Sequence, residues 1–338
     1  MLRTALRLLV ALGVSGACLY YATRGTDWAG VARLLATARP EWVLGVVVVS
    51  LACHVIRTER WRILLRPVLD APFGAAFSAT LVGFGASMVL PLRLGEIVRP
   101  ALLARRTGIG LTPAVASIVI ERLLDVLLVV MCFVVVALLF PALAAYRAMA
   151  VGLGAAGAAA LGVLYVMARH RKRADALVER IAGRLPLRLQ RVVRPIASGV
   201  LDGARGLGDA GTLAGVLALS AILWALITGT YLLSFLAIDL PVPLVAASLA
   251  TVVIVALFVF LPQGPGFVGT WQAACVVSLS LFGIEKDAAV GFSLLTWFIQ
   301  MAVNIGAGAI AAAFQDLSVR QLVRQAEVEE PARSRGAG

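Results

Sequence analysis

The stretch VLPLRLGEIVRP, residues 89 to 100, decides how this chain is expected to fold. It places Arg93, Glu96 and Arg99 within seven residues, between two prolines, in a chain that is 61% hydrophobic. A charge at membrane depth costs several kcal/mol unless it is paired or hydrated. These three side chains are therefore expected to lie against protein partners or water, away from lipid.

The composition identifies the class of protein. The chain has 338 residues, of which 14% are charged, against about 25% in typical soluble domains. Its mean hydropathy is +0.96, and several apolar runs reach the roughly 20 residues that a helix needs to cross a bilayer. The sequence therefore predicts an all-α, polytopic membrane protein.

The order of apolar and charged runs gives the domain organisation. Residues 1–23 are expected to form an uncleaved first helix with a cytoplasmic N-terminus. Residues 1–317 form one transmembrane domain, which includes a basic, amphipathic cytoplasmic segment at about 169–211. Residues 318–338 form a charged cytoplasmic tail with a composition typical of disorder. Further apolar runs are 42–56, 116–140, 148–168, 213–238, 244–261, 273–282 and 288–314.

Loop charge decides how residues 73–90 lie in the membrane. If they crossed it fully, the spans that follow would place the most basic loop, residues 169–194, outside the cell, against the positive-inside rule. A re-entrant helical hairpin removes this conflict: 73–90 enters from the cytoplasm, 91–95 turns, and 96–107 returns. Non-helical backbone at such a depth must be buried in protein or line a water-filled cavity.

A second break in an apolar segment lies in LPQGPGFVGT, residues 261 to 270. Residues 244–261 and 271–282 flank this break. They form either a second re-entrant hairpin or two short spans, because both arrangements leave the rest of the chain on the same side of the membrane. Two broken hairpins that enter from opposite faces, each turning at a Leu-Pro pair, are typical of an inverted-repeat transporter. The pattern thus favours an inverted repeat.

The charged residues of the opening stretch form the first candidate site. On a helix, Arg93, Glu96 and Arg99 at three-residue spacing share one face. Arginines in such a place can bind a phosphate or carboxylate headgroup, with Glu96 orienting them or exchanging a proton. The alternative is an internal cluster of ion pairs that holds the hairpin in place. The two interpretations are compatible.

Two further groups of charges lie at the ends of apolar runs. Glu121, Arg122 and Asp125 lie just inside a long run and must point into the bundle. They either bind substrate there or form an Arg122–Asp125 pair near the interface, with Glu121 contacting Arg93 or Arg99. Arg57 and Arg60 follow the preceding long run. These two arginines either help to capture a headgroup or, with a neighbouring tryptophan, form an ordinary interfacial anchor.

The glycine-rich break is the last candidate site. Gly264, Gly266 and Gly269 permit a close approach of the backbone. A helix that begins at Thr270, with Gln272 in its first turn, offers free N–H groups and the positive end of its dipole. An anionic group can dock there without any side-chain charge. The alternative is a packed helix break without a ligand.

Several classes of site are not expected. The four cysteines lie singly in apolar runs and the chain has two histidines, so no metal site, haem site or disulfide framework is expected. No nucleotide loop or hydrolase motif occurs, so neither an enzyme nor a cofactor is expected. The net charge of +12 fits cytoplasmic loops on anionic lipid; no nucleic-acid partner is expected. Gln300 and Asn304, four residues apart, are expected to hold helices together.

Four segments of the chain resemble, in order, the signature segments of one membrane family. They read RTERWxxLL, LPLRLGEIxRP, ERLLD and PGFVGTWQ. The family is the lysylphosphatidylglycerol synthase transmembrane family, also called flippase-like, and the resemblance covers approximately residues 5–317. The spacing of the charges in the second and third segments is its most specific part.

The resemblance implies a function and a set of site residues. In bifunctional members the membrane part is thought to translocate aminoacylated phosphatidylglycerol, and a C-terminal cytoplasmic domain attaches the amino acid. This chain resembles the membrane part without that domain. Many relatives carry a glutamate where this chain has Gln272, which implies a difference in substrate or energy coupling. The motifs carry over to Arg93, Glu96, Arg99, Glu121, Arg122 and Asp125.

The expected function is that of a lipid flippase or transporter in the inner cell membrane, with both termini cytoplasmic. It binds or translocates a polar or anionic lipid headgroup in an Arg/Glu-lined cavity, and membrane lipids are its partners. The alternative is an accessory membrane subunit that presents lipid-linked sugar or isoprenoid substrates to an enzyme. A lipid-modifying enzyme with Glu96 or Glu121 as a base is disfavoured, because the sequence offers no donor site. A homo-oligomer and a partner enzyme both stay open.

Overall fold

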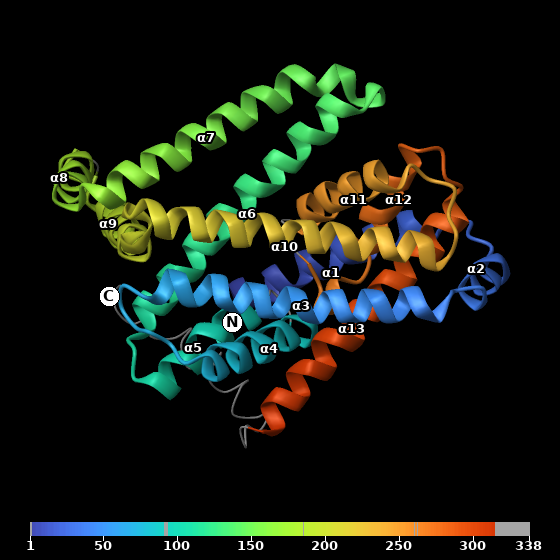
Figure 1. The fold of residues 1–338 in the computed structure, drawn as a ribbon, viewed down its shortest axis with the longest axis horizontal. Coiled ribbons are helices and arrows are strands. Elements are labelled where there is room, and N and C mark those ends of the chain that lie inside the picture. The colour runs from blue at the N-terminus through green and yellow to red at the C-terminus, as the bar shows by residue number, and fades with distance from the viewer. Residues whose placement is uncertain (1, 91–93, 185, 260, 262, 315–338) are drawn as a thin grey trace.

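A computed structural model describes residues 2–90, 94–184, 186–259, 261 and 263–314. These residues form thirteen α-helices, three short 3-10 helices and no strand (Figure 1). The α-helices are α1 (Leu2–Thr23), α2 (Trp28–Ala36), α3 (Pro40–Leu65), α4 (Phe73–Val89), α5 (Gly95–Thr107), α6 (Leu111–Leu139), α7 (Arg147–Arg169), α8 (Arg171–Ala182), α9 (Leu187–Gly203), α10 (Ala210–Ala237), α11 (Leu244–Val259), α12 (Thr270–Ser280) and α13 (Lys286–Ala313). The 3-10 helices are η2 (Pro141–Tyr146), η3 (Arg205–Gly208) and η4 (Pro265–Phe267). Arg93 with its predicted turn neighbours 91–92, and the predicted tail 318–338, lie outside the described residues.

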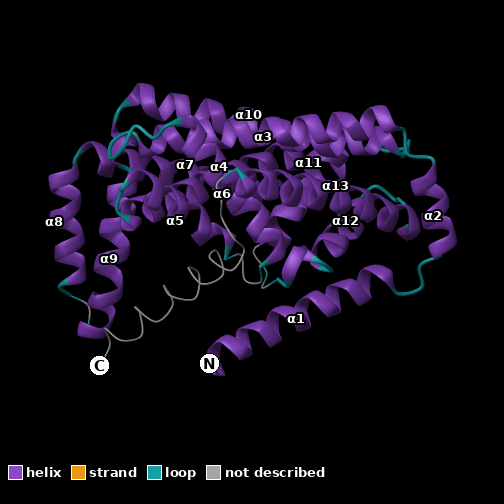
Figure 2. Cartoon of the chain, turned by 90° about the horizontal axis from the view of Figure 1, so that it is seen from below, coloured by secondary structure: helices purple, strands orange, loops and turns teal. Residues whose placement is uncertain are grey.

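Five helices are long and apolar enough to cross a membrane: α3, α6, α7, α10 and α13. Figure 1 and Figure 2 both show α3 and α10 lying side by side along the longest axis of the molecule. Large apolar side chains such as Leu44, Leu139 and Val163 are exposed on the outside of these helices, where a bilayer would cover them. The prediction of an all-α, polytopic membrane protein is confirmed, and residues 2–23 form one helix as expected.

Two pairs of helices form hairpins: the first is the one that the sequence predicts, and the second lies at the break where the sequence left a hairpin or two short spans open. α4 and α5 are antiparallel neighbours, and so are α11 and α12; all four are shorter than the five long helices. In Figure 1 the first hairpin enters the bundle from the end where α8 and α9 lie, and the second from the end nearer α2. Their tips meet inside, where Gly266 lies against the end of α4 at Met88. The hairpins therefore have the opposite entry directions of an inverted repeat.

Close backbone contact holds the first hairpin together. Gly95, at the start of α5, lies so close to α4 that a side chain there would overlap the carbonyl of Gly83. On the other side of α4, Gly85 lies close to the backbone of α13, where an added Cβ would be 2.9 Å from the Asn304 carbonyl oxygen and 3.2 Å from the Gly308 Cα. Small residues permit such an approach, and close packing drives helix association in membranes. The first hairpin is thereby fixed to α13.

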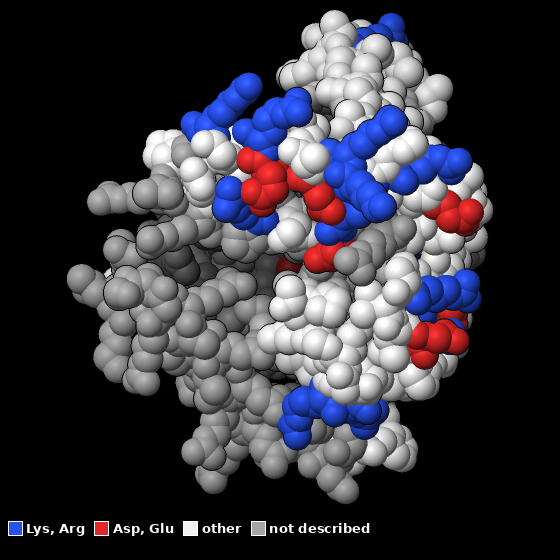
Figure 3. Space-filling view, turned by 90° about the vertical axis from the view of Figure 1, so that its left-hand side faces the viewer, with Lys and Arg blue, Asp and Glu red and all other residues white. Residues whose placement is uncertain are grey.

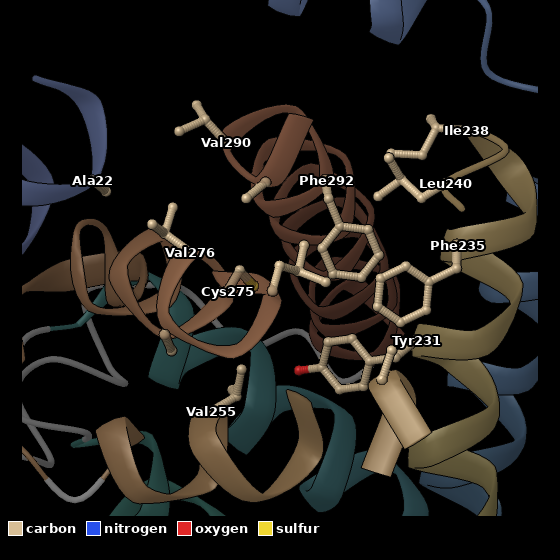
Figure 4. Packing of buried hydrophobic residues seen from close by; sticks show 14 of the residues in the cluster. Ala22, Tyr231, Phe235, Ile238, Leu240, Val255, Cys275, Val276, Val290 and Phe292 are labelled. Atoms are coloured by element: carbon tan, nitrogen blue, oxygen red, sulfur yellow. The ribbon is translucent and has the colours of Figure 1, made fainter. Parts of the chain in front are cut away.

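The largest hydrophobic cluster holds the second hairpin against the long helices. In Figure 4 the rings of Tyr231 and Phe235 on α10 lie beside Phe292 on α13, near Val255 of α11 and Cys275 of α12. The ring centroids of Phe235 and Phe292 are 4.2 Å apart in a stacked arrangement, which adds to the stabilisation from burial. Both helices of the second hairpin are therefore packed into the bundle.

Basic residues gather at one end of the molecule. Figure 3 looks at the end formed by α8 and α9, and Lys and Arg side chains cover much of the upper part of this face, with a group of Asp and Glu among them. α8 carries Arg171, Lys172, Arg173 and Arg180, and Arg171 pairs with Asp175 one turn later at 3.0 Å. The basic segment that the sequence places at about 169–211 consists of α8, α9 and η3.

A helix cap starts α10 at this end. The Asp209 Oδ2 accepts a hydrogen bond of 2.7 Å from the backbone N–H of Thr212, which satisfies one of the free donors in the first turn. This hydrogen bond lowers the pKa of the exposed Asp209 carboxyl below its usual value, because it favours the ionised form. The chain therefore turns from η3 into α10 at Asp209.

Candidate functional site

α3 carries the polar side chains around which the site is built. Pro40 in its first turn and Glu41 beside it favour the start of a helix here. Ser50, His54 and Arg57 follow at spacings of four and three residues, which place them on one face of α3. This face lines an internal cavity of the bundle.

Glu121 on α6 is the centre of a buried group of charges. Its two carboxylate oxygens each accept a hydrogen bond of 3.1 Å from the Arg99 Nη1. The Arg122 Nη2 donates to Oε1 at 2.9 Å, and the Arg60 Nη2 forms an ion pair with the same oxygen at 3.2 Å. The Glu121 side chain is fully buried, so its charge depends on these arginines from α3, α5 and α6.

Asp125, one turn further along α6, extends the group. Its Oδ1 accepts a hydrogen bond of 2.6 Å from the Arg60 Nη1 and one of 3.4 Å from the Trp224 Nε1. Its Oδ2 forms an ion pair with the Arg122 Nη2 at 3.1 Å. The Arg60 Nη1 also donates to the Ser220 Oγ on α10 at 3.2 Å. We refer to Arg60, Arg99, Glu121, Arg122 and Asp125 as the ion cluster.

Trp61 closes the ion cluster on one side. The Arg99 guanidinium lies over its ring, 4.1 Å from the ring centroid, which is within the range of a cation–π interaction. The Trp61 Nε1 donates a hydrogen bond of 2.9 Å to the Ser117 Oγ. Arg60 and Trp61 are both fully buried. These two residues therefore do not form an interfacial anchor, which was the alternative for this segment.

An internal cavity of about 250 Å³ lies beside the ion cluster and takes wall residues from both hairpins and from α3, α6, α10 and α13. Its polar lining residues are Ser50, His54, Arg57, Ser87, Glu96, Arg122, Thr230, Gln300 and Asn304. Its apolar and aromatic lining residues include Trp224, Tyr231, Val252, Val255, Ala256, Phe267 and Trp271. The cavity is therefore amphipathic.

Arg57 is a cation of the cavity wall that the ion cluster leaves unpaired. Its guanidinium lies over the Phe84 ring, 4.5 Å from the centroid. Across the described part of the chain, no carboxylate forms an ion pair or hydrogen bond with Arg57, and its buried Nε lacks a hydrogen-bond partner. Because an unpaired buried cation is costly, Arg57 favours an anion in the cavity.

The structure brings together the charged residues that the sequence singles out, apart from Arg93, which lies outside the described residues. Three of them line the cavity: Arg57, Glu96 and Arg122. Four lie in the ion cluster behind it: Arg60, Arg99, Glu121 and Asp125, and Arg122 belongs to both groups. The two charged residues on α5 therefore have different surroundings: Glu96 lies at the cavity wall, and Arg99 binds Glu121 on α6.

The glycine-rich break packs against α1. The Gly264 N–H donates a hydrogen bond of 2.8 Å to the Ser15 Oγ, and a side chain on Gly269 would overlap the Ser15 backbone. The N-terminus of α12 is capped from within, because the Gly269 N–H donates to the Gln272 Oε1 at 2.7 Å. Thr270 and Gln272 are both buried. These contacts match the packed helix break, with its N–H groups directed into protein.

The same break places two aromatic residues in the cavity wall. Gly266, at the tip, has a φ of 66°, which glycine adopts with little strain. Its carbonyl accepts a hydrogen bond of 2.6 Å from the Trp297 Nε1 on α13. Phe267 and Trp271, on either side of the last glycine, line the cavity. The turn thus contributes to the site through these neighbours.

Sequence reasoning missed several neutral residues of the cavity, including Ser50, His54 and Trp224. Gln300 and Asn304 do hold helices together: the Gln300 Nε2 donates to the Ser50 Oγ at 3.0 Å, and the Asn304 Nδ2 donates to the Gln300 carbonyl at 2.7 Å. Both also line the cavity. The sequence signal that could have placed Gln300 and Asn304 at the cavity is their four-residue spacing, since polar residues one turn apart in an apolar run share a face.

Metal ligands are not gathered in the parts of the chain that the structure covers: no three His, Cys, Asp or Glu side chains there are placed to hold an ion. Cys18, Cys53, Cys132 and Cys275 are free thiols.

Comparison with known proteins gives one result. No curated protein and no solved structure matches the chain. The family model for the lysylphosphatidylglycerol synthase TM region matches residues 8–308, a range that begins in α1, ends in α13 and includes both hairpins and the ion cluster. The chain therefore belongs to the lysylphosphatidylglycerol synthase transmembrane-region family.

Proposed function

We propose that this protein is a lipid transporter of the flippase type, which holds a polar or anionic lipid headgroup in its cavity and moves it between leaflets. The observation that carries the proposal is the amphipathic cavity between the two hairpins. Its lining combines Arg57, Glu96 and Arg122 with aromatic and aliphatic side chains. A lipid has the same division into a charged head and an apolar chain.

The polar side of the cavity can replace the water that a headgroup loses. A charge or polar group moved into hydrocarbon without partners costs several kcal/mol or more. Arg57 and Arg122 supply opposite charge to a phosphate, and Ser50 and Gln300 supply hydrogen-bonding groups. Arg122 is held by Glu121 at 2.9 Å, so the position of its charge is fixed before a ligand binds.

The two hairpins suit exchange between the leaflets. Each ends inside the bundle, and their tips meet between Met88 and Gly266, two residues next to or in the cavity wall. In transporters built from opposed broken helices, small movements of one unit against the other open a central site to alternate sides. A shift of either hairpin relative to α13 would expose the cavity in the same way.

The charge distribution orients the protein in this proposal. The end with α8 and α9 carries the basic residues seen in Figure 3, and basic loops stay on the cytoplasmic side. We therefore place this end in the cytoplasm and the protein in the inner cell membrane, with both termini cytoplasmic. Anionic lipids of that leaflet attract the same residues.

The acids of the ion cluster serve as counter-charges in this proposal, and no chemical conversion is assigned to them. Glu121 is bound by Arg99 and Arg122, and Asp125 is bound by Arg60. A general base must reach the proton that it removes, and both of these carboxylates lie behind the cavity wall. Glu96 does line the cavity, and we assign it the same role of counter-charge, since its charge interacts with that of Arg122. Transport of an unmodified lipid is the proposed activity, and membrane lipids are the proposed partners.

Transbilayer movement of a fluorescent anionic phospholipid in proteoliposomes tests this function. A membrane-impermeant quencher added outside destroys the fluorescence of the outer leaflet only. Vesicles that contain the protein are expected to lose the fluorescence of both leaflets, because lipid from the inner leaflet becomes accessible. Flipping no faster than in protein-free vesicles would overturn the proposal, and lipid binding without flipping would favour the accessory role.

A matched pair of variants on α11 connects flipping to the cavity. Ala256 lines the cavity, so Ala256→Trp fills it and is expected to abolish flipping. Leu257, the next residue, is 57% exposed on the outside of α11, so Leu257→Trp is expected to retain flipping. Equal flipping by the two variants would show that lipid crosses by another route.

A further inference from the structure

We propose that four aromatic rings close the cavity towards the end of the molecule where α2 lies, and that these rings separate when a ligand passes on that side. The rings belong to Tyr231 and Phe235 on α10, Trp271 on α12 and Phe292 on α13. We call these four residues the aromatic gate. The proposal rests on the proposed function, since it names a barrier that a transported lipid has to pass.

One face of α10 changes from cavity wall to packed core along the helix. Trp224, Ile227 and Tyr231, at spacings of three and four residues, line the cavity. The same spacing continues to Phe235 and Ile238, which are 0% and 3% exposed and belong to the largest hydrophobic cluster. In Figure 1, α10 runs from the end with α8 and α9 to the end near α2. On the side of α2, this face of α10 is therefore covered by packed side chains.

α13 shows the same change in the opposite chain direction. It begins near the segment that leads into α2, where the Lys286 Nζ donates a hydrogen bond to the Arg24 carbonyl. Phe292, in the second turn of α13, is fully buried in the same hydrophobic cluster. Gln300 and Asn304, two and three turns later, line the cavity. Both helices therefore place packed apolar side chains between the cavity and the end with α2.

Ring contacts close the aromatic gate. Phe235 and Phe292 are stacked, with centroids 4.2 Å apart, and the Tyr231 ring lies 6.4 Å from Phe292 and 6.2 Å from Trp271. Figure 4 shows Tyr231, Phe235 and Phe292 together between α10 and α13. A polar group that crosses packed rings loses its hydrogen-bond partners, and hydrophobic constrictions gate channels in this way. The rings therefore block a headgroup while they remain in contact.

The aromatic gate has a line of separation between α10 and the other two helices. Within the part of the chain that the structure covers, the hydroxyl groups of α10 bond to carbonyls of α10 itself, and no hydrogen bond joins α10 to α12 or α13. By contrast, the Trp271 Nε1 on α12 donates to the Thr296 Oγ1 on α13 at 3.1 Å. Apolar contacts can part without leaving a donor or acceptor unpaired. The two rings on α10 are therefore expected to move away from the two on α12 and α13.

Reversible crosslinking across the aromatic gate tests whether it has to open. In a chain whose native cysteines are replaced, Phe235→Cys and Phe292→Cys are joined by a short bifunctional methanethiosulfonate, and flipping is measured in proteoliposomes. The crosslinked protein is expected to stop flipping, because α10 and α13 can no longer separate. Reduction of the crosslink is expected to restore flipping. Equal flipping before and after the crosslink would overturn the proposal.

A crosslink within one hairpin is the matched control. The hydroxyl groups of Thr251 on α11 and Ser278 on α12 lie 3.0 Å apart. In the same chain, Thr251→Cys and Ser278→Cys are joined by the same reagent, which connects the two arms of the second hairpin. Flipping is expected to be unchanged, because the hairpin can still move as a unit. Equal inhibition by both crosslinks would overturn the assignment of the gate to the four rings.

Access of a reagent to the cavity gives a second test, which does not require transport. Ala256→Cys in the cavity wall reacts with a small, membrane-impermeant, anionic methanethiosulfonate added on the side of α2. Removal of two gate rings by Phe235→Ala and Phe292→Ala is expected to raise the rate of this reaction at least about tenfold. Phe73→Ala with Phe77→Ala is the control, because this stacked pair lies on α4 alone, and the rate is expected to be unchanged.

Folding of each variant is followed by its melting temperature. Leucine replaces alanine at the two gate positions if the alanine variant does not fold, since leucine also removes the stacked rings. An unchanged reaction rate in the folded gate variant would overturn the proposal. Failure of the gate differs from failure of transport. If the protein does not flip lipid but removal of the rings admits the reagent, transport alone fails; flipping that neither change affects overturns the gate alone.

Discussion

Arg60 is fully buried and contacts two carboxylates, at 3.2 Å from Glu121 and 2.6 Å from Asp125. Arg99 and Arg122 share these carboxylates. Buried ions repay the cost of losing water only when their geometry is good and their hydrogen bonds are satisfied. Removal of one member leaves the others buried without a counter-charge, so the side chains of the ion cluster depend on one another.

Replacement of the central carboxylate measures this dependence. Glu121→Gln is expected to lower the free energy of unfolding by about 3–5 kcal/mol, because it leaves buried arginines without their counter-charge. The loss is read from unfolding of the purified protein in detergent. Glu59→Gln is the control, since Glu59 pairs with Arg62 at a partly exposed position, where the cost is about 0–1 kcal/mol. Equal losses for the two variants would contradict the account of the ion cluster.

The hydrogen bond between the Trp61 Nε1 and the Ser117 Oγ is expected to contribute to the stability of the protein. Trp61→Phe keeps an aromatic ring under Arg99 and removes the N–H donor. It is expected to cost about 0.5–1.5 kcal/mol. In a double-mutant cycle, Ser117→Ala is expected to cost less in the Trp61→Phe background than alone. Additive losses would mean that the hydrogen bond contributes nothing to stability.

The sequence predicts which charges matter better than it predicts their partners. Charged residues are rare in the apolar runs, so Glu121 and Asp125 stand out, and both must point inward. From the sequence, contact of Glu121 with Arg93 or Arg99 is one alternative, and Arg99 does reach Glu121 on α6. The sequence does not predict that Arg60 also contacts Glu121, because that contact depends on how α3 and α6 pack. His54 was not predicted as a cavity residue, because its place in the cavity wall also depends on how the helices pack.

At the first hairpin, α4 and α5 contact each other through their backbones. A side chain on Gly83 would lie 2.7 Å from the Arg99 Cβ and 3.1 Å from the Gly95 carbonyl. The number of membrane crossings and the charge of the loops predicted the hairpin and the lengths of its arms, because both depend on the whole order of spans. The glycine contacts could not be predicted, because the sequence does not show which backbone a small residue will face.

Gly83→Ala tests the close approach of α4 and α5. The added methyl group overlaps both partners, so a loss of about 1–3 kcal/mol in stability is expected. Gly74→Ala is the matched control on the same helix, because no atom lies within 4 Å of the added group, and alanine favours a helix. The two melting temperatures are compared in the same detergent. Similar values would show that α4 and α5 separate readily.

On the scale of the whole molecule, charge is distributed unevenly along the long axis. The end with α8 and α9 is strongly basic (Figure 3). Ion pairs occur at both ends, as between Arg171 and Asp175 on α8 and between Arg33 and Asp27 on α2. The basic segment at one end was predicted from the order of charged residues along the chain, since the positive-inside rule acts on loops whatever their structure.

Labelling of single cysteines in intact cells tests the proposed orientation. In a chain whose native cysteines are replaced, Arg180→Cys on α8 is expected to resist a membrane-impermeant maleimide until the cells are permeabilised. Arg33→Cys on α2 is expected to react at once, because α2 lies at the opposite end (Figure 1). Both positions are exposed to solvent. The reverse labelling pattern would show that the protein has the opposite orientation in the membrane.

The contact of Gly85 with Asn304 and Gly308 has a consequence for biosynthesis. α4 leaves the ribosome early, whereas α13 is the last of the described helices to be made. Until α13 is inserted, the first hairpin lacks one of the surfaces that fix it, and α4, with 17 residues, is at the short end of the range for a membrane-spanning helix. The nascent chain must therefore hold this hairpin in an unfinished state, and synthesis of its last helix completes the wall of the cavity.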